Sequence, residues 1–96
     1  MGIWDILNKK YLLIDDHFKL THDEGNTPLD EIEIFNGLEI GIKREDLNPS
    51  GSHKDRGLAY EISYHHSKGH NNFVISSSGN SAISAFNLCR DRDIIL

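Results

Sequence analysis

The sequence has only one cysteine, Cys89, and no long apolar run. A single cysteine excludes an intrachain disulfide and any metal site built from several cysteines. No segment approaches the roughly 20 apolar residues that a membrane-spanning helix needs. The N-terminus also lacks the basic-then-apolar pattern of a signal peptide. These absences predict a soluble protein in a reducing, cytoplasmic setting, with no membrane partner.

Apolar and basic residues are both scarce. Hydrophobic residues make up 38% of the 96, and the mean hydropathy is −0.46. They are gathered in short runs, so we expect one small folded domain and not general disorder. Ten basic residues stand against 15 acidic ones, a net charge of −5 with the histidines neutral. Because nucleic-acid binding needs a basic surface, no nucleic-acid partner is expected.

The first half of the chain mixes helical, turn and strand patterns. Residues 3–7 have helical apolar spacing, and residues 22–29 carry turn chemistry. The acidic residues 30–33 are expected on the solvated surface. Residues 38–43 alternate apolar and polar side chains, which predicts a strand with one buried face.

The second half repeats a strand and helix order. A helix is expected over residues 52–68, with Ser52 as its N-cap. Residues 73–75 are typical of a short buried strand, residues 82–89 have helical apolar spacing, and residues 94–96 begin another apolar run. This order predicts an α/β fold of three-layer βαβ units with a parallel sheet. Because a parallel strand normally continues into another element, we expect the chain to be incomplete.

The densest polar cluster is the segment 48–57, which places Lys54 at the expected start of a helix. The partial positive charge of a helix N-terminus favours a neutral amine there. A neutral amine is what a Schiff base with an aldehyde cofactor requires. Taken alone, the pattern fits an ordinary basic residue beside an N-cap more readily. It does not match the phosphate-binding pattern GxxxxGK[ST].

A second polar cluster, residues 76–81, lies between an apolar run and a helix. Its hydroxyls, its glycine and the N–H groups of a helix start suit a carboxylate or a phosphate. A polar strand-to-helix turn with a serine cap explains it equally well.

The remaining candidates are weaker. The histidines near the end of the expected helix, His65, His66 and His70, lack the spacing of metal ligands, so no metal is expected. Cys89 lies on the apolar stripe of its helix and is expected in the core.

Three motifs occur in one order: Glu-Gly-Asn-Thr-Pro-Leu at 24–29, Lys-Arg-Glu-Asp-Leu-Asn-Pro-Ser-Gly-Ser-His-Lys-Asp-Arg-Gly at 43–57, and Ser-Ser-Gly-Asn-Ser at 77–81. Together they resemble the fold-type-II pyridoxal-phosphate (PLP) enzymes, which are similar to the tryptophan synthase β chain. This family includes threonine synthase, serine/threonine dehydratase and cysteine synthase. The similarity covers about residues 22–96, which marks the chain as an N-terminal portion.

The resemblance implies roles for individual residues. Lys54 matches the catalytic lysine that forms a Schiff base with PLP and later transfers a proton. Asn80 matches the asparagine that contacts the ring hydroxyl of PLP. The loop that binds the α-carboxylate of the amino-acid substrate is matched by Ser77, Ser78, Gly79 and Ser81.

Within the family, the motifs are most similar to threonine synthase. This implies elimination and replacement at the β and γ carbons of an amino acid, from O-phosphohomoserine to threonine. His53 departs from that branch, in which phenylalanine usually precedes the lysine. A histidine there resembles the tryptophan synthase β chain, where it lies near the cofactor phosphate. The resemblance therefore leaves a serine/threonine dehydratase or a cysteine synthase-like lyase as an alternative.

Family members hold the PLP phosphate with a glycine-rich loop from a later, second domain, and the eight glycines here never cluster. We therefore expect residues 1–30 to lead into a partial α/β domain at 31–96, with the second domain absent. The isolated chain is expected to be inactive and to need the remaining domain or a homo-oligomer. The alternative is a catalytically inactive remnant that acts as an interaction module.

Overall fold

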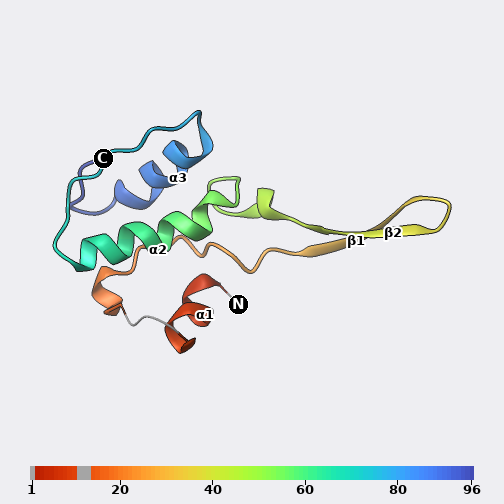
Figure 1. Ribbon diagram of the computed structural model, residues 1–96, viewed down its shortest axis with the longest axis horizontal. Coiled ribbons are helices and arrows are strands. Elements are labelled where there is room, and N and C mark those ends of the chain that lie inside the picture. Colours follow the sequence, from red (N-terminus) through yellow and green to blue (C-terminus); the bar gives the residue numbers. More distant parts are fainter. Residues whose placement is uncertain (1, 11–13) are drawn as a thin grey trace.

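The computed structural model describes residues 2–10 and 14–96. Its described elements are the helices α1 (Ile3–Lys10), α2 (Lys54–Ser67) and α3 (Asn80–Cys89), the strands β1 (Leu29–Phe35) and β2 (Leu38–Lys43), and the short 3-10 helices η1 (Asp16–Phe18) and η2 (Glu45–Leu47). The helices gather into one body, and the hairpin of β1 and β2 projects from it (Figure 1). No helix in the described ranges is long and apolar enough to cross a membrane.

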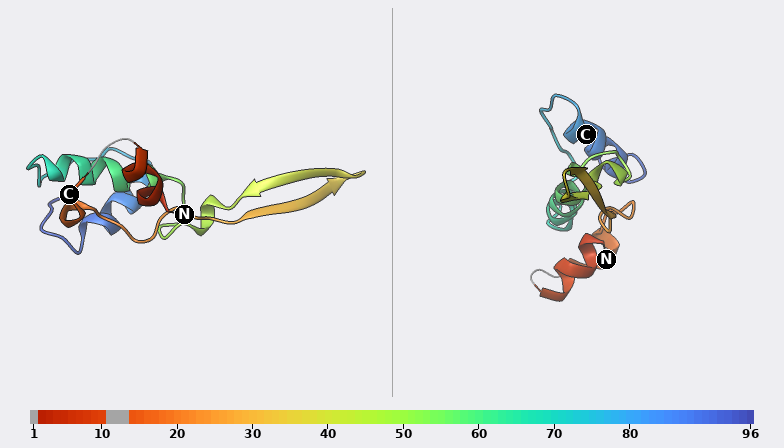
Figure 2. Two further views of the ribbon diagram at one scale, coloured as in Figure 1. Left: turned by 90° about the horizontal axis from the view of Figure 1, so that it is seen from below. Right: turned by 90° about the vertical axis from the view of Figure 1, so that its right-hand side faces the viewer.

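The projecting hairpin is an antiparallel pair in which Ile32 lies opposite Ile40. Its turn is the pair Asn36 and Gly37, with φ angles of 48° and 78°. Positive φ at both positions is the geometry that an Asn-Gly turn supplies, and it matches the twist of the strands. Figure 2 shows the hairpin extending beyond the helices as a thin ribbon.

The hairpin confirms one predicted strand and corrects its burial. Residues 38–43 form β2, as expected, but the face expected to be buried is open, with Leu38 59% and Ile42 37% exposed. Among the described helices and strands, β1 and β2 contact only each other, so nothing covers that face. Residues 30–33 are largely exposed, as expected, although they form β1.

The core lies where α2 crosses α3. Both predicted helices are confirmed, and Cys89 is buried as expected. The buried apolar side chains come from these two helices, from α1 and from the segments beside them: Ile3, Leu20, Ala59, Ile62, Ala85, Leu88, Cys89 and Ile94.

The ends of α2 follow local signals. The N-cap of α2 is His53, which makes no side-chain capping bond, so the expectation that Ser52 is the N-cap was wrong by one residue. Ser52 precedes the N-cap and accepts a hydrogen bond from the Lys54 N–H at 3.3 Å. Gly69 follows the last turn with a φ of 96°, a conformation that glycine adopts without a steric cost. The helix therefore starts at Lys54 and ends before Gly69.

Of the predicted parallel sheet, the described residues form one isolated parallel β-bridge, between Asn72, before α3 in the sequence, and Ile95, after it. The Phe73 N–H donates to the Ile95 carbonyl at 2.8 Å, and the Ile95 N–H donates to the Asn71 carbonyl at 2.8 Å. Neither segment forms a strand, and Val74 is 99% exposed, so the expectation of a buried strand at 73–75 was wrong. A parallel strand is stable when both of its faces are covered, whereas here Phe73 and Ile75 are partly buried against the core and Val74 between them is open to solvent.

We expect Leu88→Ala to lower the free energy of unfolding by about 2–5 kcal/mol, because it opens a cavity between α2 and α3. Leu38→Ala is the matched control, since the same atoms are removed from a side chain that is 59% exposed. Denaturant unfolding followed by circular dichroism measures both. Equal losses in the two variants would contradict the position of the core.

Candidate active site

Lys54 is the first residue of α2, and its side chain is exposed. The described residues give its amine no hydrogen-bond partner. It borders a cleft of about 320 Å³ that lies between the starts of α2 and α3 and is lined by His53, Lys54, Gly57, Leu58, Glu61 and Ser81. Three of the residues singled out from the sequence, His53, Lys54 and Ser81, therefore lie along one cleft, although they come from two separate motifs.

The other candidate residues lie in the loop before α3 and at its first position. Ser77 accepts a hydrogen bond from the Gly79 N–H at 3.0 Å, which closes a local turn. Asn80 begins α3 and is exposed, as is Ser78. None of these four lines the Lys54 cleft. Ser81 therefore lines the same cleft as Lys54, whereas residues 77–80 do not line it.

A bidentate ion pair joins the first turn of α2 to η2, close to Lys54 in the sequence. The Arg56 guanidinium donates to both carboxylate oxygens of Glu45, from Nε at 2.7 Å and from Nη2 at 2.9 Å. Glu45 also accepts from the Thr27 hydroxyl at 2.8 Å and from the Asn48 amide at 2.8 Å. One carboxylate therefore connects η2, the start of α2 and the 24–29 motif.

The same network explains Gly25. The Gly25 N–H donates to the Asn48 side-chain oxygen at 2.8 Å, and the Gly25 φ is 85°. A Cβ at this position would meet an Arg56 guanidinium nitrogen at 3.1 Å and the Gly2 Cα at 3.3 Å. A side chain is therefore disfavoured by backbone conformation and by space together.

The electrostatics of Glu45 follow from its donors. Hydrogen bonds from Arg56, and then from Thr27 and Asn48, outweigh partial burial and lower its pKa from 4.5 to about 2. The ion pair in turn raises the pKa of Arg56. The pair is therefore fully charged at neutral pH.

A second buried carboxylate adjoins Lys54 in the sequence. Asp55 is 3% exposed and accepts from the Ser50 N–H at 2.7 Å and from the Ser84 hydroxyl at 2.5 Å. The sequence placed Asp55 in the first helical turn but gave no sign of Ser84, because the two residues are far apart along the chain. The contact links α3 to the turn before Lys54.

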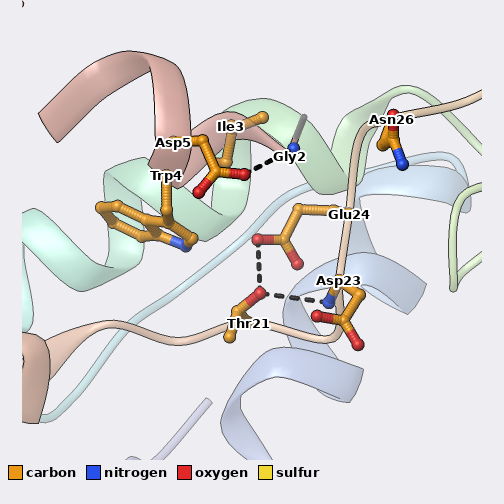
Figure 3. Close-up of a pocket in the computed structure, with 8 residues that line it drawn as sticks. All are labelled: Gly2, Ile3, Trp4, Asp5, Thr21, Asp23, Glu24 and Asn26. Atoms are coloured by element: carbon orange, nitrogen blue, oxygen red, sulfur yellow. Dashed lines mark hydrogen bonds between the residues drawn. The ribbon is translucent and has the colours of Figure 1, made fainter. Parts of the chain in front are cut away.

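A larger cavity of about 450 Å³ lies between α1 and the loop 21–26, and it does not include Lys54. Figure 3 shows Glu24 turned towards Thr21 at its edge. Glu24 is 2% exposed and accepts from the Thr21 hydroxyl at 2.9 Å and the His22 N–H at 2.8 Å. The acidic residue of the Glu-Gly pair therefore holds its own turn in place.

The remaining reactive side chains form no further centre. Within the described ranges, no group of three or more His, Cys, Asp or Glu side chains could hold a metal ion. The His66 ring nitrogen Nδ1 lies 2.8 Å from the Asn71 side-chain oxygen. Burial raises the pKa of the Cys89 thiol, which disfavours its reactive thiolate form.

Comparisons with known proteins agree with the motifs. Residues 20–94 match the family described as pyridoxal-phosphate dependent enzyme. The chain is 36% identical over 69 residues to threonine synthase of Halalkalibacterium halodurans, which covers 69% of this chain and 20% of that protein. It is 36% identical over 74 residues to threonine synthase of Mycobacterium leprae, covering 74% and 21%. For threonine synthase of Methanocaldococcus jannaschii, the identity is 34% over 89 residues, covering 88% and 22%. The chain spans about a fifth of the length of these relatives.

We expect Glu45→Gln to lower the free energy of unfolding by about 1–3 kcal/mol, the range for losing hydrogen bonds to a charged group. Glu31→Gln is the matched control, because Glu31 lies exposed on β1. Thermal and urea unfolding measure both variants. A loss no larger than that of the control would show that the ion pair does not organise this region.

The pH dependence of unfolding tests whether the charged Glu45 carboxylate stabilises the fold. Because the pKa of Glu45 is lowered from 4.5 to about 2, its carboxylate stabilises the fold above pH 4.5, and this contribution is lost as the pH falls towards 2. The difference in unfolding free energy between the wild type and Glu45→Gln should therefore shrink across that interval. A difference that stays constant would mean that another group sets the effect.

Proposed function

The chain belongs to the family of pyridoxal-phosphate dependent enzymes, and from this premise we propose that Lys54 is the residue to which the cofactor bonds, in a threonine synthase-like reaction. The observation that carries the proposal is the shared cleft, along which Lys54 and His53 from the start of α2 lie with Ser81 from the start of α3. A lysine and an anion-binding loop are the two groups that PLP chemistry on an amino acid requires from these residues.

The described residues suit one end of the cofactor. The Lys54 amine has no partner among them, so it is available to an aldehyde. The phosphate end is different, since no cluster of glycines lies near the cleft, and a Cβ added at Gly51, Gly57 or Gly79 would meet only open space. A tight phosphate cradle is therefore not built by these glycines.

When bound, the cofactor supplies an electron sink for the carbanion that forms at the substrate. The residues of this chain would bind and orient. The Asn80 amide would hydrogen-bond the ring hydroxyl, and His53 would lie near the phosphate, as the family resemblance implies. Lys54 would carry a proton to and from the substrate Cα. The substrate carboxylate would be held by the hydroxyls and backbone N–H groups of Ser77, Ser78, Gly79 and Ser81.

We further propose the setting of the reaction. The substrate would be a small amino acid, and the similarity to threonine synthases favours O-phosphohomoserine. His53 favours a second candidate, a serine/threonine dehydratase or cysteine synthase-like lyase, because it departs from the phenylalanine of the threonine synthase branch. In either case the remaining enzyme domain would supply the phosphate-binding loop and complete the parallel α/β fold, and the assembled enzyme would act by itself or as a homo-oligomer. A cytoplasmic location fits these substrates.

We expect the protein expressed from the complete gene to show a visible absorption band with PLP, and Lys54→Ala to abolish it. Lys68→Ala is the matched control, because Lys68 lies exposed at the far end of α2. Absorbance spectra, followed by borohydride reduction and peptide mapping, locate the modified lysine. A band that persists in Lys54→Ala would refute the assignment.

The same spectra distinguish the two reactions. We expect titration with O-phosphohomoserine to shift the band at lower concentration than L-serine or L-threonine, because this substrate adds a phosphate to the carboxylate that the loop 77–81 would hold. A shift with L-serine alone would favour the lyase.

A further inference from the structure

The carboxylate of Asp55 is a buried charge directly beside Lys54 in the sequence. Its two oxygens each accept one hydrogen bond, Oδ2 from the Ser50 N–H at 2.7 Å and Oδ1 from the Ser84 hydroxyl at 2.5 Å. Burying a charge costs free energy unless it is hydrogen-bonded, so losing either contact should destabilise the fold. The N-terminal end of α2 favours the negative charge at this position as well.

One partner of this carboxylate, Ser84, belongs to a polar row on α3. Ser81, Ser84 and Asn87 are spaced three apart and therefore lie on one face of the helix. Ser84 donates to Asp55, and the Asn87 amide donates to the Ser50 hydroxyl at 2.9 Å. The third member of the row, Ser81, lines the Lys54 cleft. Because a helix is stiff over one turn, the two hydrogen-bonded members determine where the third one lies.

We propose that Asp55 and Ser84 are positioning residues for the Lys54 cleft. Their hydrogen bond holds the start of α3 against the start of α2 and so sets Ser81 and its loop at a fixed distance from the Lys54 amine. This inference rests on the proposed function, since it takes Lys54 and Ser81 as the residues to be aligned.

A purely stabilising role is the alternative, and α2 provides a matched control for it. Ser63 is fully buried, like Ser84, and its hydroxyl makes one hydrogen bond, accepting from the Leu20 N–H at 2.8 Å. Ser63→Ala therefore removes a buried serine contact on the side of α2 away from the cleft. Ser84→Ala and Ser63→Ala should lower the melting temperature to a similar extent.

The first measurement does not depend on the cofactor. In the ¹⁵N-labelled chain, we expect Ser84→Ala to speed hydrogen exchange at the Ser50 N–H by about tenfold, the factor that corresponds to one lost hydrogen bond. The amide signals of Lys54 and Ser81 should shift as well. Ser63→Ala should leave these three signals unchanged. Unchanged signals in Ser84→Ala would overturn the inference.

The second measurement uses PLP with borohydride trapping, and it compares the modification of Lys54 with that of Lys68. We expect Ser84→Ala to lower this ratio several-fold and Ser63→Ala to preserve it. A ratio that is the same in both variants would overturn the positioning role. Should the wild type show no preference for Lys54, the proposed function fails, whereas the amide signals still test the contact itself. Should Ser84→Ala not fold, Asp55→Asn keeps the size of the side chain and should produce the same two changes.

Discussion

The ion pair between Glu45 and Arg56 holds together the backbone segments that lead into the candidate site. Because Glu45 also accepts from Thr27 and Asn48, one carboxylate ties the turn-rich 24–29 motif to the segment that leads into α2. Lys54 begins that helix, so the ion pair helps to fix the backbone from which its side chain projects. In a chain with a small core, such a local network compensates for limited apolar burial.

The three motifs thus divide into residues that hold the backbone and residues left available for chemistry. From the sequence, Lys54 and Ser81 could be named as candidates. Spacing alone favoured an ordinary basic residue for Lys54 and left the serine cluster open, so their functional roles rest on the family resemblance. The structure added that the two share a cleft. The contact between Asp55 and Ser84 could not be predicted, because no local pattern reports which distant residues will meet.

Local signals predicted the fold where they were sufficient. The helices at 52–68 and 82–89 were confirmed because apolar spacing and, for the first of them, a terminal glycine act within one segment. The strand β1 was missed because its acidic residues at 30–33 were assigned only to the solvated surface, although the Asn-Gly pair at 36–37 marks a hairpin turn. The burial of residues 38–43 and 73–75 was wrong, because burial of a strand depends on elements that no local pattern specifies.

The hairpin has one apolar face and one acidic face. Ile32 and Ile40 lie opposite each other on one side, and Glu33 and Glu39 do so on the other, since alternate residues of a strand point to opposite faces. At neutral pH the negative charge of the chain makes neighbouring molecules repel one another, which keeps the apolar faces of their hairpins apart. Near the isoelectric point of about 5.6, net repulsion between molecules vanishes. The exposed apolar face and the unpaired strand edges of the hairpin then favour association between molecules, although the glutamates of its other face remain charged.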